Sequence, residues 1–164
     1  MTEESRSEQD GAKAARAQRG GAQGNAGGEA AAGQGDAHAA PVASSLAFVV
    51  DDDDKARDFI SAILADLGID AAGYPTAKDA LAALDERHPR MIFLDIALQS
   101  SDAIDVIHGL KQRDYRGVVH LMSGGRPWLL ESIARLGKRQ GIALADPLPK
   151  PVSREAIVQA AARG

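Results

Sequence analysis

The sequence contains no cysteine among its 164 residues. Without thiols the chain can form neither a disulfide framework nor a zinc–thiolate site. Its formal charge of −4 is unlike that of a general nucleic-acid binder, which normally carries a basic patch. No apolar run approaches the roughly 20 residues that span a bilayer, and the acidic N-terminus lacks the apolar core of a secretory signal. We therefore expect a cytoplasmic protein that binds neither membranes nor nucleic acid.

Large apolar residues are scarce in residues 1–45. This segment holds 8 of the 17 glycines and no Phe, Tyr or Trp. Such a composition cannot bury enough apolar surface to offset the entropy that is lost on ordering. We predict that residues 1–45 are a disordered tail and that residues 46–164 form one domain, which is a typical domain length.

Residues 46–164 alternate short apolar runs with amphipathic segments. The apolar runs predict strands at residues 46–50, 69–74, 91–95, 118–123 and 142–149. Strands that alternate with helices form βαβ units, and these units build a parallel sheet. Five such repeats in about 120 residues fit the flavodoxin-like (βα)5 doubly wound α/β fold, with the strand order 2-1-3-4-5.

The segments between the strands carry apolar residues at helical spacing. In residues 55–68 one stripe holds Phe59, Ile60, Ile63, Leu64 and Leu67. Thr76 and Ser153 are placed to cap the second and the last helix, and Ser101 or Asp102 to cap the third. Pro127 suits the first turn of the fourth helix.

Two of the predicted strands end in acidic residues. The first is followed by Asp51 and Asp52, and the third ends in Asp95. Taken alone, a strand-end Asp is better explained as a helix cap. In open α/β sheets, however, ligands bind at the carboxyl ends of the strands, beside the switch point that the first and third strands form. Three carboxylates at that point repel one another unless a cation lies between them, and hard oxygen ligands favour Mg²⁺.

The last two strands also end in residues with polar side chains. Ser123 offers a hydroxyl after the fourth strand, and Lys150 an ammonium group after the fifth. The four strand-end motifs are Val49-Val50-Asp51-Asp52, Phe93-Leu94-Asp95, Leu121-Met122-Ser123-Gly124 and Leu148-Pro149-Lys150-Pro151. As an ordered set they resemble the receiver domains of two-component response regulators, over residues 46–162.

The resemblance implies a phosphoacceptor signalling domain, with no enzymatic activity beyond its own phosphorylation and dephosphorylation. It implies that Asp95 is the phosphoacceptor and that Asp51 and Asp52 are the acidic pair at a metal site. It also implies that Ser123 is the hydroxyl that responds to phosphorylation. Lys150 would contact a phosphoryl oxygen as a point charge.

On this interpretation Mg²⁺ is the cofactor. We expect Asp52, Asp95 and the backbone carbonyl of Ala97 to hold it, with Asp51 acting mainly through bound water. The ion would neutralise charge that develops during phosphoryl transfer.

The resemblance also implies partners. A histidine kinase or a histidine phosphotransfer protein would supply the phosphoryl group. We expect a stand-alone receiver that signals through the surface of its fourth and fifth helices, to an output protein or in a homodimer. In finer detail the chain resembles receivers that are joined to cyclic-di-GMP phosphodiesterase domains.

Two features depart from the usual receiver pattern. Receivers commonly carry an aromatic residue three positions before the lysine, where this chain has Pro147. The spacing from Ser123 to Lys150 is a few residues longer than usual. Trp128 could supply a different reporter, although we interpret it first as an anchor packed between the fourth helix and the sheet.

Two other function classes stay open at this point. A haloacid-dehalogenase-like phosphatase also uses a strand-end Asp, Mg²⁺ and a lysine, but it resembles a pattern with a second Asp two residues after the nucleophile, where this chain has Ala97. The other is a receiver-shaped interaction module that does not need phosphate.

Ala97 and Gly125 lack side chains that could orient a water molecule beside the phosphoryl group. We therefore expect a phosphorylated receiver to lose its phosphoryl group slowly.

Overall fold

The computed structural model describes residues 45–98 and 102–164. The elements of these residues are, in chain order, β1 (Leu46–Val50), α1 (Asp54–Asp66), β2 (Asp70–Tyr74), α2 (Ala77–Ala83), β3 (Met91–Asp95), α3 (Asp102–Gln112), β4 (Val118–Ser123), α4 (Pro127–Gln140), β5 (Ala143–Leu144), β6 (Leu148–Pro149) and α5 (Arg154–Arg163). No helix among them has the length and apolar character that a membrane crossing requires.

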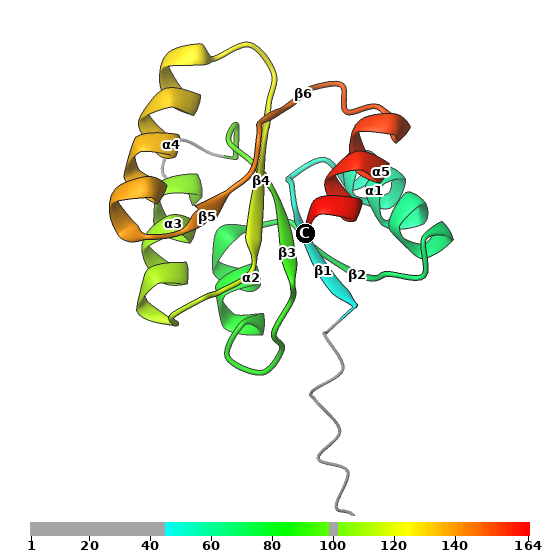
Figure 1. Ribbon diagram of the computed structural model, residues 1–164, viewed down its shortest axis with the longest axis horizontal. Coiled ribbons are helices and arrows are strands. Elements are labelled where there is room, and N and C mark those ends of the chain that lie inside the picture. The colour runs from blue at the N-terminus through cyan, green and yellow to red at the C-terminus, as the bar shows by residue number, and fades with distance from the viewer. Residues whose placement is uncertain (1–44, 99–101) are drawn as a thin grey trace, which may run out of the picture. The chain divides into compact units, whose positions relative to one another are not determined.

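The strands form one parallel sheet in the order β2-β1-β3-β4-β5, with β6 also paired to β4 (Figure 1). This is the order that the sequence predicts. Strands β2 and β3 lie on opposite sides of β1, so the strand order reverses there. Strands β1 and β3 are therefore neighbours at the switch point.

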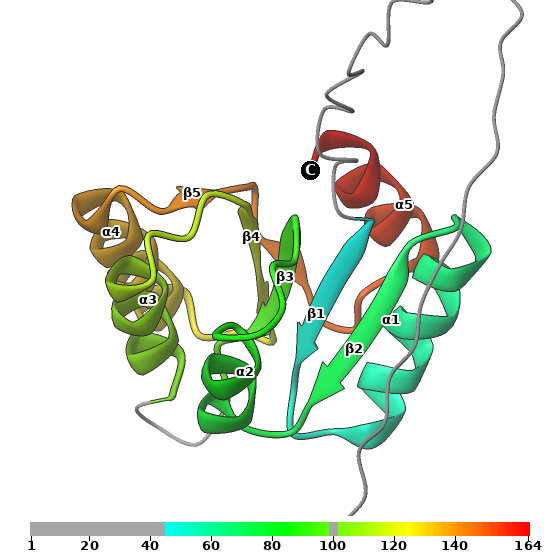
Figure 2. The ribbon, with the colours of Figure 1, turned by 90° about the horizontal axis from the view of Figure 1, so that it is seen from below.

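Helices cover both faces of the sheet (Figure 2). The side chains of α2, α3 and α4 share one core with the sheet, and those of α1 and α5 share the other. Strand β3 contributes to both, because Ile92 and Leu94 join the first core while Met91 and Phe93 join the second. Every residue of β3 is buried. Each large apolar side chain that is buried in this way stabilises the fold by about 1.5–3 kcal/mol.

The helix starts follow local capping chemistry. The hydroxyl of Thr76 accepts a hydrogen bond from the N–H of Asp79, and that of Ser153 accepts one from the N–H of Ala156. Both caps are as the sequence predicts, and Pro127 does begin α4. The predicted cap at Ser101 lies outside the described residues.

The apolar stripe of α1 is wider than the face that the helix buries. Ile60, Ile63 and Leu64 are buried, whereas Phe59 and Leu67 of the same stripe are exposed. The helix packs on β1 and β2 and against α5, and these neighbours cover only its central strip.

Trp128 is also not the packed anchor that we expected. Its side chain is 68% exposed. The face that α4 buries is centred on Ile133 and Gly137. Residues five apart lie about 140° from each other around a helix, so Trp128 projects away from the side that Ile133 presents to the sheet.

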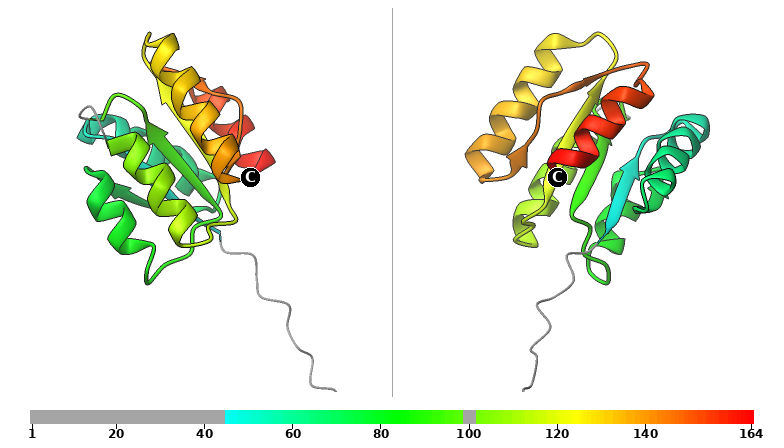
Figure 3. Two further views of the ribbon diagram at one scale, coloured as in Figure 1. Left: turned by 90° about the vertical axis from the view of Figure 1, so that its left-hand side faces the viewer. Right: turned by 45° about the vertical axis from the view of Figure 1, so that its right-hand side comes forward.

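The fifth strand is interrupted, as its prolines predict. Strand β4 pairs with β5 through Val118 and Ala143. It pairs with β6 through Met122 and Leu148. The β5–β6 segment therefore holds one residue more than β4 between these pairings, which is the geometry of a bulge. Pro147 lies in the extra stretch and has no N–H to donate to a ladder. The segment runs between α4 and α5 (Figure 3).

Candidate functional site

The sheet brings Asp51 and Asp95 together at its carboxyl edge. Val50 lies opposite Leu94 in the β1–β3 ladder, so the next residue of each strand is an aspartate. Both aspartates are buried, with Asp51 at 0% and Asp95 at 2% exposure. Buried carboxylates are stable only where charges or hydrogen bonds compensate for lost water.

The third acid, Asp52, completes a compact cluster. One carboxylate oxygen each from Asp51, Asp52 and Asp95 lie within 4.8 Å of one another. Asp52 is exposed, and its carboxylate has no hydrogen bond or ion pair within the part of the chain that the structure describes. Three hard oxygen donors at this spacing, with one side open to solvent, fit a hydrated Mg²⁺.

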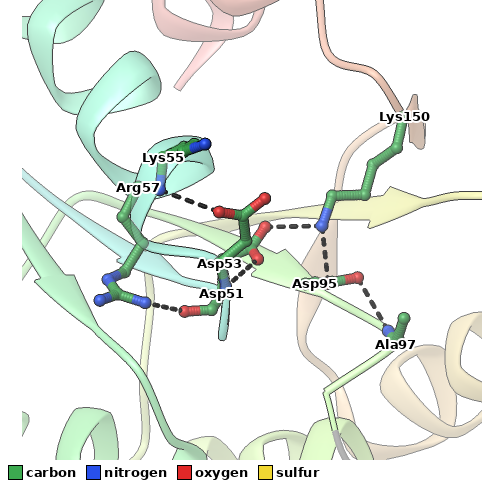
Figure 4. A network of polar contacts seen from close by, with 7 residues as sticks. All are labelled: Asp51, Asp53, Lys55, Arg57, Asp95, Ala97 and Lys150. Carbon is green, nitrogen blue, oxygen red and sulfur yellow. Dashed lines mark hydrogen bonds and ion pairs between the residues drawn. The ribbon is translucent and has the colours of Figure 1, made fainter.

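Lys150 bridges the two buried aspartates. Its Nζ lies 2.7 Å from Oδ2 of Asp51 and 2.7 Å from Oδ2 of Asp95 (Figure 4). Desolvation disfavours its charged form, but the hydrogen bonds and the charges of the two aspartates outweigh this effect and raise the pKa of Lys150 above its usual value. The ammonium group therefore stays charged at neutral pH and compensates the buried acids.

Main-chain groups orient both carboxylates further. Oδ1 of Asp95 accepts a hydrogen bond of 2.8 Å from the N–H of Ala97. Oδ1 of Asp51 accepts one of 3.0 Å from the N–H of Asp53. Asp53 in turn caps α1, because its carboxylate accepts a hydrogen bond from the N–H of Lys55. The loop that starts α1 therefore also carries Asp51 and Asp52, two of the three acids of the cluster.

Ser123 lies at the end of β4, next to the same edge. Its carbonyl accepts a hydrogen bond of 2.8 Å from the N–H of Lys150, which ties the fourth strand to the lysine. Its hydroxyl has no hydrogen-bond partner among the described residues. A Cβ on Gly124 would lie 3.7 Å from Cβ of Lys150, so the loop after Ser123 passes close to the lysine side chain.

All of the side chains that the sequence singles out therefore lie at one edge of the sheet. The sequence interpretation missed Arg57, whose Nη1 donates a hydrogen bond of 2.6 Å to the main-chain carbonyl of Asp51. It also gave Asp53 no role. The available signal for Arg57 was its position three residues after Asp54 on α1, but such a pair is usually a solvated ion pair on a helix surface.

The arrangement can accept an electrophile at Asp95. Its two oxygens accept hydrogen bonds from Ala97 and Lys150, so the carboxylate is fixed in direction. The neighbouring lysine and a cation in the acidic cluster would neutralise an incoming anionic group. This combination suits phosphoryl transfer to a carboxylate oxygen.

Comparison with solved structures supports a receiver fold. NtrX from Brucella abortus, in complex with ATP, superimposes with a TM-score of 0.62 at 30% identity, over 72% of this chain and 26% of that chain. The receiver domain of a Francisella response regulator superimposes with a TM-score of 0.61 at 22% identity, over 72% of this chain and 93% of that domain.

A curated relative is an uncharacterized 14.6 kDa protein of Leptolyngbya boryana, which is 33% identical over 64 residues. The match covers 39% of this chain and 49% of the relative, so the chain spans about half of that protein and about a quarter of NtrX. The family of response regulator receiver domains matches residues 47–162, almost all of the described part. This chain belongs to the response regulator receiver domain family.

Proposed function

We propose that Asp95 accepts a phosphoryl group from a phosphohistidine of a histidine kinase or a histidine phosphotransfer protein. Receiver domains interact with such donors and with output partners, and the family is a phosphoacceptor signalling domain. The observation that carries the proposal is the setting of Asp95. It is a buried carboxylate in hydrogen-bond contact with Lys150, within 4.8 Å of two further acids.

The transfer requires little covalent chemistry from the protein. An oxygen of Asp95 forms a bond to phosphorus while the P–N bond to the donor histidine breaks, and the leaving imidazole takes up a proton. The product is an acyl phosphate on Asp95. The incoming group is strongly anionic, so positioning and charge neutralisation dominate the catalysis.

Lys150 has a specific part in this proposal. Before transfer its ammonium group binds Asp51 and Asp95. Formation of the acyl phosphate lowers the charge on the Asp95 carboxyl and places new anionic oxygens beside it. The ammonium group then moves its hydrogen bond from Asp95 to a phosphoryl oxygen, while its bond to Asp51 holds it in place.

Receiver domains bind Mg²⁺ at an acidic pocket, and the aspartate cluster of this chain fits that ion. We assign Asp52, Asp95 and the backbone carbonyl of Ala97 as its protein ligands, with Asp51 acting through water. When bound, Mg²⁺ supplies positive charge against the phosphoryl oxygens.

The donor docks beside α1 in this proposal. A hollow of about 360 Å³ lies there, bordered by Phe59, Lys150, Pro151 and Val152. Its lining is mainly apolar, and Phe59 is 47% exposed at its rim. An apolar surface that adjoins the phosphoacceptor edge is placed to receive the protein that delivers the phosphoryl group.

The output leaves through the other side of the molecule. A hydrogen bond from Ser123 to the phosphoryl group would draw the loop of Gly124 and Gly125 inward and move the start of α4. Pro147 cannot change rotamer, so displacement of α4 carries the signal. A groove between α4 and β5, bordered by Lys138, Leu144 and Pro147, offers a surface that this movement would reshape.

One experiment tests phosphoryl acceptance. The chain is incubated with acetyl phosphate and Mg²⁺, and its intact mass is measured. We expect the mass of one phosphoryl group to be added, and we expect EDTA to prevent the addition. An unchanged mass at saturating donor and Mg²⁺ would overturn the proposal and favour the phosphate-independent interaction module.

A further inference from the structure

Arg57 connects α1 to the loop that carries the acidic cluster. Its side chain is only 14% exposed, whereas that of its ion-pair partner Asp54 is 83% exposed. Nη2 binds Asp54. Nη1 donates the 2.6 Å hydrogen bond to the carbonyl oxygen of Asp51, as Figure 4 shows. The exposed ion pair contributes little. The hydrogen bond to the buried carbonyl of Asp51 is charge-assisted and therefore the stronger contact.

Strand β2 leaves room for the arginine. Gly73 lies beside Val49 in the β1–β2 ladder. A Cβ on Gly73 would lie 3.3 Å from Cδ of Arg57 and 3.6 Å from its Cβ. A side chain at this position would press on the arginine stem, so Arg57 would have to shift slightly from its course toward Asp51.

The hydrogen bond fixes the peptide plane between Asp51 and Asp52. A peptide unit is planar, so holding its carbonyl oxygen also fixes the direction of the following N–H and Cα. The N–H of Asp51 is held separately by the carbonyl of Tyr74, at 3.2 Å. The carboxylate of Asp52 has no contact of its own among the described residues, so its place in the cluster depends on this main chain.

We propose that Arg57 is a positioning residue for the metal site. It holds the Asp51–Asp52 peptide in the orientation that keeps their carboxylates beside Asp95. The proposal rests on the proposed function, because it assigns Arg57 to the Mg²⁺ site of the same phosphoacceptor. Replacing a side chain that orients a metal ligand typically lowers metal affinity by about 10–100-fold.

The first test replaces Arg57 with Met, which keeps the stem and removes the donors. Mg²⁺ binding is measured by calorimetry, and phosphoryl uptake from acetyl phosphate is measured against Mg²⁺ concentration. We expect the Mg²⁺ dissociation constant and the half-saturating Mg²⁺ concentration to rise by about 10–100-fold. The uptake rate at saturating Mg²⁺ should return to nearly the parent value. Arg57→Lys, which keeps one donor, should recover part of the affinity.

Two matched variants separate positioning from stability. Asp54→Asn removes the exposed ion pair and should leave Mg²⁺ affinity unchanged. Gly73→Ala crowds Arg57 without removing its charge, and it should weaken Mg²⁺ binding in the same direction as Arg57→Met. A purely structural role would lower the midpoint of thermal unfolding without altering the Mg²⁺ affinity of the folded protein.

The outcomes distinguish this inference from the function on which it rests. If the parent chain is phosphorylated by acetyl phosphate and binds Mg²⁺, an unchanged Mg²⁺ affinity in Arg57→Met overturns only the role of Arg57. If that variant does not fold, Arg57→Lys decides instead, because an affinity equal to that of the parent in folded Arg57→Lys overturns the role of the guanidinium group. A parent chain that neither binds Mg²⁺ nor takes up phosphate overturns the proposed function.

Discussion

Nζ of Lys150 lies 2.7 Å from Oδ2 of Asp51, although 99 positions separate the two residues in the chain. The ammonium group is shared with Asp95, so a single cation compensates two buried carboxylates. Removing one partner of a buried ion pair leaves an uncompensated charge, which costs more than the pair itself contributes.

We therefore expect Lys150→Met to lower the free energy of unfolding by about 3 kcal/mol in the absence of Mg²⁺. Mg²⁺ should restore part of the loss, because it can compensate the same carboxylates. Urea denaturation with and without Mg²⁺ measures both effects. Arg154→Met is the control, since it removes an exposed ion pair with Asp66 that contributes less than about 1 kcal/mol. Equal losses in the two variants would contradict the assignment.

Asp52 should contribute strongly to metal binding although its side chain is exposed. Asp52→Ala removes one anionic ligand and should weaken Mg²⁺ binding roughly tenfold or more, which corresponds to about 1.4 kcal/mol or more. Calorimetry measures the change. Asp58→Ala removes an exposed acid of α1 outside the cluster and should have little effect. Equal affinities for Asp52→Ala and the parent would place the metal elsewhere.

His120 should make the fold sensitive to acid. It is buried, its ring stacks on Phe93 with centroids 5.0 Å apart, and its Nε2 has no hydrogen-bond partner among the described residues. Burial, and to a lesser degree the charge of Arg163, lowers the pKa of His120 to about 4 from the usual 6.5. The unfolded chain therefore binds a proton below pH 6.5 that the folded chain does not bind until about pH 4.

Because the unfolded state takes up the extra proton, stability falls as the pH falls through this window. The loss should reach about 3 kcal/mol between pH 6.5 and pH 4. His120→Leu should remove this part of the pH dependence and leave stability at pH 7.5 equal or higher. Denaturant titrations at several pH values test the prediction, with His88→Gln as an exposed control. An unchanged pH profile in His120→Leu would refute it.

The lifetime of the phosphorylated state should depend on the side chain at Ala97. This residue is exposed two positions after Asp95, and its own side chain cannot orient a water. Ala97→Asn should speed dephosphorylation by roughly fivefold to thirtyfold, because one added hydrogen bond is worth about 1–2 kcal/mol in the barrier. Ala97→Val adds bulk without a hydrogen bond and should not accelerate the decay. The time course of phosphoryl loss after removal of the donor measures the difference. Gly125 is unsuitable for the same test, since its φ of +96° would strain any side chain.

The strand order and the edge of the sheet that carries the site could be predicted from sequence. Apolar strands that are followed by or end in an aspartate are typical of a parallel sheet whose carboxyl edge carries the site. The ladder between β1 and β3 makes Asp51 and Asp95 neighbours there. The caps at Thr76 and Ser153 were predictable for a similar reason, since each needs only local chain geometry.

Features that depend on tertiary packing were not predictable. The stripe on α1 does not reveal that the sheet and α5 cover only its centre, which leaves Phe59 exposed. The hydrogen bond of Arg57 follows from how α1 packs beside β2, where Gly73 adjoins the arginine stem. The prolines indicated an interruption between β5 and β6. The bulge itself depends on the pairing of β4 with β5 before Pro147 and with β6 after it.

The central claim is that Asp95 carries the phosphoryl group, and chemical mapping of the modified residue tests it most directly. Borohydride reduces an acyl phosphate on an aspartate to homoserine, which peptide mass spectrometry locates. After treatment with acetyl phosphate and Mg²⁺, we predict homoserine at position 95, and none at that position when the donor is omitted. Homoserine at Asp51 or Asp52 with Asp95 unmodified would contradict the account.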